Sequence, residues 1–404
     1  MLFLVYINDL VDVVNNGIKL FADDTVLHIT VDDARAAADA LNSDLLNIQL
    51  WAKQWLVTFS PEKTKSMCVS LKKNSNASDI PLIFNDVHLE EIKEHKHLGI
   101  IFNNKLKWSD HVNAIIKTVS KFSDVFLKLK YKLDRKTLEI IYLTFVRPKL
   151  EYGSILFDDC TEQDKTRLEN VQLNFARCVT GAKRGTSHKL IYDEISWQTL
   201  SERRKTNKLK FMQKIVHKQA PPYLVDLLPT VVGHDTPYNL RNRQNHRQYD
   251  FHTSKFQHSL LPDCVNMWNE LGENVRTIEN KELFKETIAL KNNHNPLFNG
   301  INRKLGLIHA QFRMECSNLN SHLFDLHVID NSYCSCMNGR EDCFHFFFSC
   351  PLYNVERLKL FNDVQKLCVV SLECLLYGDK KLNLNQNLEI FGYVERFILE
   401  TGRF

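Results

Sequence analysis

The sequence predicts an α+β fold that is mostly helical, with its strands confined to the first part of the chain. Three patterns support this prediction. The first hundred residues contain short apolar runs separated by turn-forming residues, as in β-hairpins. The residues that follow carry apolar side chains at helical spacing. Near the end, cysteines and a histidine gather in one short segment, which predicts a small metal-dependent module.

Length and composition limit the class of protein. A chain of 404 residues with 44% hydrophobic side chains is large enough for two or three packed domains. The formal charge is only +4, so any nucleic-acid site must be argued from local clusters of cations. The eleven cysteines follow a start that lacks the basic leader of a secretory signal. We expect a reducing, intracellular setting, nuclear or cytoplasmic, and no membrane contact.

The first ten residues predict a packed helix. They place four apolar side chains on one helical face: Phe3, Tyr6, Ile7 and Leu10. No capping residue precedes this helix, which indicates a chain that has lost its beginning.

Asp23 and Asp24 lie between two apolar runs, residues 18–22 and 25–29, which predicts a β-hairpin with the acids at its tip. Asp-Asp is a poor choice for a two-residue turn, so a role other than turn formation is indicated. Paired carboxylates can hold divalent cations, and two cations about 4 Å apart can clamp a phosphoryl transfer. The alternative is a solvated acidic turn. If the four residues 21–24 are considered without their context, this alternative is the favoured interpretation.

The next elements are a helix and short strands. Asp32 or Asp33 caps a helix that ends before Pro61. Its buried stripe is expected to contain Leu41, Leu45, Ile48, Ala52 and Trp55. Residues 67–71 are expected to form a strand, and residues 82–89 and 98–102 a strand pair.

Several motifs in this region occur together in a fixed order. They are Leu2 to Leu10, Phe21-Ala22-Asp23-Asp24-Thr25, Trp55 with Lys63-Thr64, His97-Leu98-Gly99-Ile100, and Leu106-Lys107-Trp108 with His111. In order and spacing the sequence resembles the reverse transcriptase, an RNA-directed DNA polymerase, of jockey-like non-LTR (LINE-type) retrotransposons. The resemblance continues through Arg147 to Ser154 and Leu168 to Gln172 and covers residues 2 to 360.

The resemblance implies roles for individual residues. Asp23 would be a catalytic Mg²⁺ ligand in the palm, Asp24 its partner, and Leu98-Gly99 a grip on the primer. Lys63 matches a family lysine that can meet the leaving pyrophosphate. Ser60 stands where the family has Asn, and Lys63 can equally be an ordinary loop lysine.

The chain then becomes helical and basic, as expected for a thumb beside a nucleic-acid duplex. Its cations are Lys117, Lys121, Lys128, Lys130, Lys132, Arg135 and Lys136. Thr161 and Asp164 predict a capped helix buried through Leu168, Gln172, Phe175 and Val179.

Residues 201–218 hold a strong charge run. Seven cations face one acid, Glu202, and the apolar stripe of Leu209, Met212 and Ile215 leaves exposed faces for them. We expect Arg203, Arg204, Lys205 and Lys208 to contact the phosphates of an RNA template and DNA primer. The alternative is a solvated helix face. Trp268 and Phe284, further along, are expected to pack.

The cysteine and histidine segment contains Cys334, Cys336, His345 and Cys350. Three thiolates and an imidazole suit structural Zn²⁺. The Cys-x-Cys gap is short, and Cys343 is a competing ligand. The alternative is a set of reduced core cysteines beside phenylalanines, with His345 bonded to a backbone carbonyl. Arg313 and Glu341 lie around this segment as in the family's cysteine-histidine motif.

The expected domains are residues 1–105, the C-terminal half of a palm; residues 106–230, a thumb; residues 231–295, a linker and packing segment; and residues 296–404, the Cys/His module with a helical tail.

The chain is expected to be the C-terminal portion of a retrotransposon RNA-directed DNA polymerase. It should be inactive alone, because the fingers and the first catalytic aspartate are missing. The alternative is a non-catalytic, RNA- or DNA-binding remnant. Sequence upstream of Met1 would decide between them.

Overall fold

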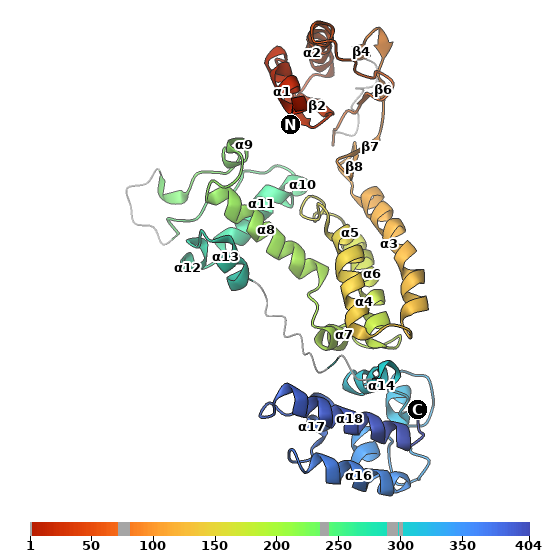
Figure 1. Cartoon of the computed structure of the whole chain (residues 1–404). Coiled ribbons are helices and arrows are strands. Elements are labelled where there is room, and N and C mark those ends of the chain that lie inside the picture. The colour runs from red at the N-terminus through yellow and green to blue at the C-terminus, as the bar shows by residue number, and fades with distance from the viewer. Residues whose placement is uncertain (1, 72–80, 235–241, 289–297, 299–301) are drawn as a thin grey trace. The chain divides into compact units, whose positions relative to one another are not determined.

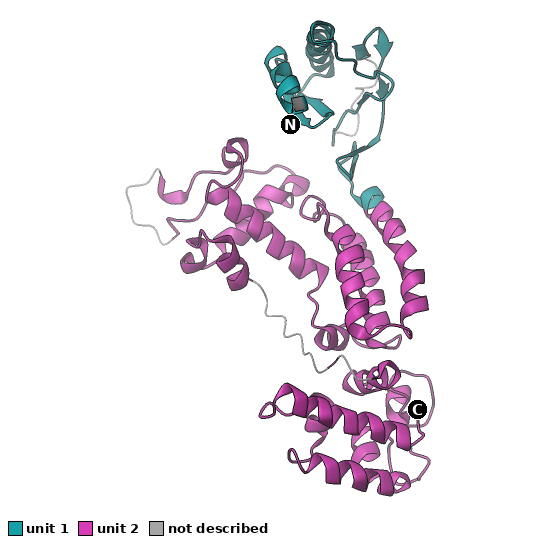
Figure 2. Ribbon diagram, viewed as in Figure 1, with its two compact units in different colours: residues 1–111 teal, residues 112–404 magenta. Residues whose placement is uncertain are grey.

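The computed structural model describes residues 2–71, 81–234, 242–288, 298 and 302–404. Figure 1 shows that helices dominate the chain, and all the strand pairs of the described part fall before residue 104. The mostly helical α+β class is therefore confirmed. The chain divides into two compact units, residues 1–111 and 112–404 (Figure 2), and each is described by itself.

Unit 1 opens with two short helical segments and a hairpin: α1 (Leu2–Ile7), η1 (Asn8–Val13), β1 (Gly17–Phe21) and β2 (Asp24–His28). Ile7 and Leu10 are buried against the next helix, whereas Phe3 and Tyr6 are 48% and 39% exposed. Two of the four side chains on the predicted apolar face are therefore buried, and the other two are exposed.

The register of the hairpin differs from the prediction. Phe21 pairs with Asp24, which leaves Ala22 and Asp23 as the two turn residues. Ala22 has φ 52°, and a positive φ at the first central residue is a feature of hairpin turns that match the strand twist. The expectation that both acids occupy the tip was wrong, because Asp24 is already the first residue of β2.

Helix α2 (Ala34–Gln54) is capped by Asp33, whose side chain accepts a hydrogen bond from the Arg35 amide. This confirms one of the two predicted caps. Trp51 is 4% exposed and Trp55 is 38% exposed, so Trp55 was wrongly placed in the core. The helix ends one residue before Trp55, and its last buried turn therefore presents Trp51.

Short strands complete unit 1: β3 (Lys65–Ser66), β4 (Ile83–Phe84), β5 (Val87–His88), β6 (Glu90–Glu91), β7 (Glu94–His97) and β8 (Ile100–Asn103). β3 pairs with β6, β4 with β5, and β7 with β8. The predicted strand over residues 67–71 does not form. Residues 82–89 and 98–102 do not pair with each other, because each segment lies in its own local hairpin.

In the part that the structure describes, unit 2 consists of helices joined by loops, with two isolated β-bridges. Its first helices are α3 (Ser109–Leu129), α4 (Arg135–Ile141), η3 (Tyr142–Val146), α5 (Arg147–Glu151), α6 (Glu162–Thr180), α7 (His188–Ile195) and α8 (Leu200–Val216). Thr161 accepts a hydrogen bond from the Asp164 amide at the start of α6. Leu168, Gln172, Phe175 and Val179 of that helix are buried, as predicted.

The helices that follow α8 are shorter. They are α9 (Pro222–Val225), η4 (Val232–His234), α10 (Ser254–Gln257), α11 (Leu260–Asn269), α12 (Glu273–Arg276) and α13 (Lys281–Ile288). Trp268 and Phe284 are buried together with Met212 of α8, so their predicted packing role is confirmed.

The last helices enclose a separate apolar cluster. They are α14 (Arg303–Arg313), α15 (Asn320–Asp325), η6 (His345–Ser349), η7 (Pro351–Tyr353), α16 (Asn354–Val364), α17 (Leu372–Tyr377) and α18 (Leu384–Glu400). Phe312, Phe346, Phe347 and Phe397 form the aromatic centre of this cluster. Among the described residues, no helix has the length and apolar character needed to cross a bilayer.

A buried ion cluster joins α4, α7 and α14. Glu194 accepts hydrogen bonds from Arg135 Nη1 at 2.6 Å and from Arg313 Nε and Nη2, both at 2.8 Å. Arg135 also donates to Glu139 at 2.8 Å. All four side chains are less than 10% exposed. Arg135 was expected among the solvent-facing cations of a thumb, and this expectation was wrong, because the cluster holds it in the interior.

We expect Glu194→Gln to lower the free energy of unfolding of unit 2 by about 3–5 kcal/mol, because the change leaves Arg313 buried without a counter-charge and Arg135 with Glu139 alone. Urea denaturation followed by far-UV circular dichroism measures it. The matched control is Asp193→Asn, which neutralises the exposed acid next to Glu194 on α7. Equal stability of both variants would contradict the assigned role.

The same variant should change acid sensitivity. Burial alone would raise the pKa of Glu194, but the ion pairs with Arg313 and Arg135 outweigh burial and lower this pKa. The stabilisation from Glu194 is therefore fully present above the usual carboxyl pKa of 4.5 and is lost as the pH falls through the lower folded value. Stability measured against pH should show an acid-dependent loss in the wild type that is smaller in Glu194→Gln.

Candidate functional site

The acidic hairpin is the first candidate site. Asp23 and Asp24 are both exposed, and the ladder between β1 and β2 fixes their backbone. The chain entering β1 is fixed by Asp44 of α2, which is fully buried. Its two carboxylate oxygens accept hydrogen bonds from the backbone amides of Asn15 and Asn16 at 2.9 and 3.1 Å. Asp44 of α2 therefore holds the residues that lead into the hairpin.

Two further predicted residues lie in turns of the same unit. Lys63 is exposed in the turn that begins at Pro61, where Thr64 bonds back to the Ser60 carbonyl at 2.9 Å. Leu98 and Gly99 form the turn between β7 and β8, with φ 46° and 84°. Two successive positive φ values define a type I′ hairpin turn, so the Leu-Gly turn is a tight structure with half-buried Leu98.

Three of the six cations of α8 are committed to internal ion pairs. Arg204 and Lys208 are 4% and 3% exposed, and both bind Asp158. Lys208 also contacts Asp263 at 2.5 Å. The expectation that these two cations stand on exposed faces was wrong. Their partners, Asp158 and Asp263, lie outside residues 201–218, so the charge balance of that segment alone did not include them.

The other two predicted cations of α8 differ from each other. Arg203 is half-buried and pairs with Glu151 of α5. Lys205 is exposed. Of the four predicted phosphate contacts, Lys205 alone stands on the open surface in this structure.

Helix α3 carries a more accessible set of cations. Lys117, Lys121 and Lys128 are all exposed. Their spacing of four and seven residues places them along one side of the helix. Asp124 shares this side, so the stripe has a net charge of +2. We call these three lysines the α3 lysine stripe.

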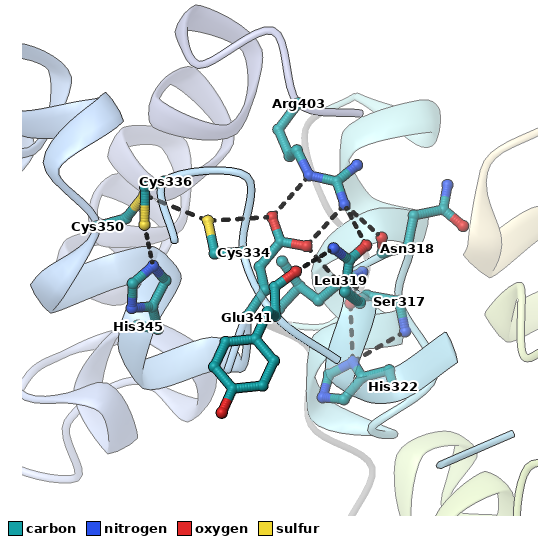
Figure 3. Close-up of polar contacts among 12 residues, drawn as sticks. Ser317, Asn318, Leu319, His322, Cys334, Cys336, Glu341, His345, Cys350 and Arg403 are labelled. Carbon is teal, nitrogen blue, oxygen red and sulfur yellow. Dashed lines mark hydrogen bonds and ion pairs between the residues drawn. The ribbon is translucent and has the colours of Figure 1, made fainter. Parts of the chain in front are cut away.

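The four predicted zinc ligands are brought together. Figure 3 shows Cys334, Cys336, His345 and Cys350 facing one another, and their ligand atoms all lie within 4.8 Å of one another. Cys334 Sγ is 3.7 Å from Cys350 Sγ, and Cys336 Sγ is 3.2 Å from His345 Nε2. Within the described part of the chain, this is the one group of three or more such side chains that could hold a metal.

Local structure explains how these ligands meet. Cys334 and Cys336 lie on a small loop closed by a bridge between Tyr333 and Arg340, and the Cys334 amide donates to the Gly339 carbonyl at 2.9 Å. His345 begins η6, and Cys350 follows its last residue. The neighbouring Phe346 and Phe347 are fully buried, so the core positions one half of the ligand set and the loop carries the other half.

One distance in this group agrees with the geometry of a zinc site. Zn–S bonds of about 2.3 Å in a tetrahedron place neighbouring sulfurs about 3.8 Å apart. The distance of 3.7 Å between Cys334 and Cys350 agrees with this value.

The thiols differ in their acidity. Burial raises the pKa of Cys334 to about 12 and also raises the pKa of Cys350. For Cys336, burial opposes ionisation, but the Asn338 amide, 3.4 Å from its Sγ, helps to lower the pKa.

Cys343 lies outside the ligand group. Its Sγ is 3.8 Å from Nε2 of His322, whose Nδ1 is bonded to Ser317 at 2.8 Å. Burial raises the pKa of Cys343 to about 12 and lowers that of His322 to about 4, so both groups are neutral near pH 7. Among the described residues, Cys343 therefore lies outside the group of four side chains that could hold a metal.

Sequence reasoning missed Arg403 near this group. Its guanidinium donates to both carboxylate oxygens of Glu341 at 2.8 Å, and Glu341 is 2% exposed. No spacing rule joins residues so far apart in the chain, and no signal in the sequence marks Arg403.

No protein-family model matches the chain, and no solved structure matches it significantly. Curated relatives do match. The probable RNA-directed DNA polymerase from transposon BS of Drosophila melanogaster is 23% identical over 188 residues, which is 45% of this chain and 20% of the relative.

Two further relatives from Drosophila melanogaster agree. The probable RNA-directed DNA polymerase from transposon X-element is 23% identical over 44% of this chain and 20% of its own length. The RNA-directed DNA polymerase from mobile element jockey is 24% identical over 58% of this chain and 26% of its own length.

These relatives are polymerases of transposable elements. The resemblance to the reverse transcriptases of jockey-like non-LTR retrotransposons, predicted from the motifs, is confirmed. The chain spans about a quarter or less of the length of these relatives.

Proposed function

We propose that the chain is the C-terminal portion of a retrotransposon RNA-directed DNA polymerase. The observation that carries the proposal is the similarity to three such polymerases over about half of the chain. The residues add a site chemistry that fits the same reaction, because the paired acids Asp23 and Asp24 stand exposed on a rigid hairpin.

In this proposal Asp23 and Asp24 hold Mg²⁺ for nucleotidyl transfer. A two-metal site stabilises both the attacking 3′-oxygen of the primer and the leaving pyrophosphate. The described residues supply no third acid grouped with this pair. The family that the sequence resembles uses a further carboxylate, and we propose that one completes this site. Lys63 would meet the pyrophosphate, and the Leu98-Gly99 turn would hold the primer.

The nucleic-acid surface is proposed to include the α3 lysine stripe and Lys205. Exposed cations in a row can follow a phosphate backbone without reading its sequence. Arg204 and Lys208 are better assigned to stability, because both are buried in ion pairs with Asp158.

The Cys/His group is proposed to bind structural Zn²⁺. Cys334, Cys336, His345 and Cys350 complete a four-ligand shell, which leaves no open position for catalysis. The metal would fix the loop around Cys334 to the helical core, and the module would contact nucleic acid rather than react with it.

The isolated chain should not extend a primer on an RNA template, because the metal site lacks a further carboxylate. The segment should be competent when it replaces the matched segment of the jockey polymerase. Asp23→Asn in that chimera should reduce incorporation to background, measured with labelled nucleotide. Asp32→Asn, a change of an acid outside the proposed site, serves as the control. Full activity of the Asp23→Asn chimera would remove the catalytic assignment.

Zinc should bind at about one equivalent per chain, measured by elemental analysis of purified protein. Cys336→Ser should remove most of the metal, because it deletes a ligand. Cys343→Ser is the matched control and should retain the metal, because Cys343 lies outside the group. A wild-type chain without zinc, or equal loss in both variants, would refute the site.

Lys117→Gln combined with Lys121→Gln should weaken binding to a primer–template duplex and reduce the steepness of its salt dependence. Each lost phosphate contact lowers the slope of log affinity against log salt by about 0.9. Fluorescence anisotropy across a salt series measures the slope. Lys208→Gln is the matched control and should lower stability while leaving the slope unchanged. The reverse pattern would place the nucleic acid on α8.

A further inference from the structure

The loop that carries Cys334 and Cys336 has few buried side chains of its own. Tyr333 and Met337 are 58% and 81% exposed, and neither belongs to the apolar cluster of the module. Apolar burial therefore does not explain how this loop is held beside His345 and Cys350, which lie on the core. A polar attachment must do so.

Glu341, at the end of the loop, makes that attachment (Figure 3). Its carboxylate is buried, and Arg403 donates to both oxygens at 2.8 Å, from Nε to Oε1 and from Nη2 to Oε2. The Asn320 amide donates to Oε2 at 2.9 Å. The Glu341 amide donates to the Ser332 carbonyl at 2.8 Å, which closes the loop at its base.

Arg403 is itself held from the core side. Its Nη2 also donates to the Asn318 carbonyl at 2.9 Å. The next residue, Phe404, packs edge-on against Phe312 and Phe346, with ring centroids 5.3 and 5.5 Å apart. Phe346 directly follows His345 in the chain. Arg403 and Phe404 thus connect the two halves of the ligand set.

The charges favour the same arrangement. Glu341 Oε1 lies 4.0 Å from Cys334 Sγ. A carboxylate so close to a thiolate ligand adds a further negative charge to the three thiolates of the proposed site. The Arg403 guanidinium, in bidentate contact with that carboxylate, supplies the compensating positive charge. Bidentate hydrogen bonds between arginine and a carboxylate are stronger than hydrogen bonds between neutral groups.

We propose that the ion pair between Glu341 and Arg403 is a positioning device for the metal, and that it sets how tightly the Cys334, Cys336, His345 and Cys350 group holds Zn²⁺. This inference rests on the proposed zinc site. Neither residue is a ligand. Outer groups that orient metal ligands typically change metal affinity 10–100-fold when they are removed.

The test measures zinc affinity of the full chain by competition with a chromophoric chelator. Arg403→Gln and Glu341→Gln should each raise the dissociation constant for Zn²⁺ about 10–100-fold. Glu341→Gln keeps the shape of the side chain and an oxygen for the Asn320 amide. Arg403→Lys keeps the charge without the bidentate geometry and should fall between wild type and Arg403→Gln.

The control is Arg396→Gln, which breaks an exposed ion pair with Asp363 in the same module. It should leave the zinc dissociation constant within a factor of two. Substitution with Co²⁺ separates positioning from unfolding. The variants should keep the absorption spectrum of a three-sulfur, one-nitrogen site at saturating Co²⁺, because the ligands themselves remain.

The outcomes are distinct. Wild-type affinity in Arg403→Gln and Glu341→Gln would overturn the inference while leaving the zinc site intact. A variant that cannot form the Co²⁺ spectrum at any concentration would show that the pair maintains the fold rather than the affinity. A wild-type chain that binds neither Zn²⁺ nor Co²⁺ would refute the zinc site, and with it this inference.

Discussion

The arrangement of unit 2 depends on one buried carboxylate. Glu194 lies between Arg135 and Arg313, so three helices that are far apart in the sequence share a single ion cluster. An interior arginine is costly unless its charge is balanced and its donors are satisfied. The cluster therefore links α4, α7 and α14 through charged side chains in the interior. Phe298, whose ring centroid is 4.0 Å from the Arg313 guanidinium, covers the cluster.

Buried charge recurs through the chain with different consequences. Asp44 satisfies backbone amides and fixes the approach to the acidic hairpin. Asp158 neutralises Arg204 and Lys208, and so removes from solvent two cations that a charge count assigns to nucleic acid. Glu341 binds Arg403 beside the cysteines. In each case one acid holds a nearby segment or side chain in place.

The sequence predicted the features that depend on local chemistry. The Asp33 cap, the capped start of α6 and the mostly helical class all follow from residues close together in the chain. The four Cys and His side chains were also found, because metal ligands have recognisable types and spacing. The failures that concern charged side chains have one cause. The burial of Arg135, Arg204 and Lys208 and the role of Arg403 depend on partners distant in sequence, which no periodicity reveals. The hairpin register failed for a local reason, because Ala22 adopts a positive φ.

The split origin of the Cys/His group has a consequence for the order of assembly. His345 and Cys350 flank phenylalanines that are fully buried, so hydrophobic collapse alone sets these two donors in place. The loop bearing Cys334 and Cys336 is closed within a few residues and has little to gain from collapse. The ion pair between Glu341 and Arg403 instead brings this loop to the other two donors. Ion capture would then be the last step in the maturation of the module, because the four donors are already gathered before the ion enters.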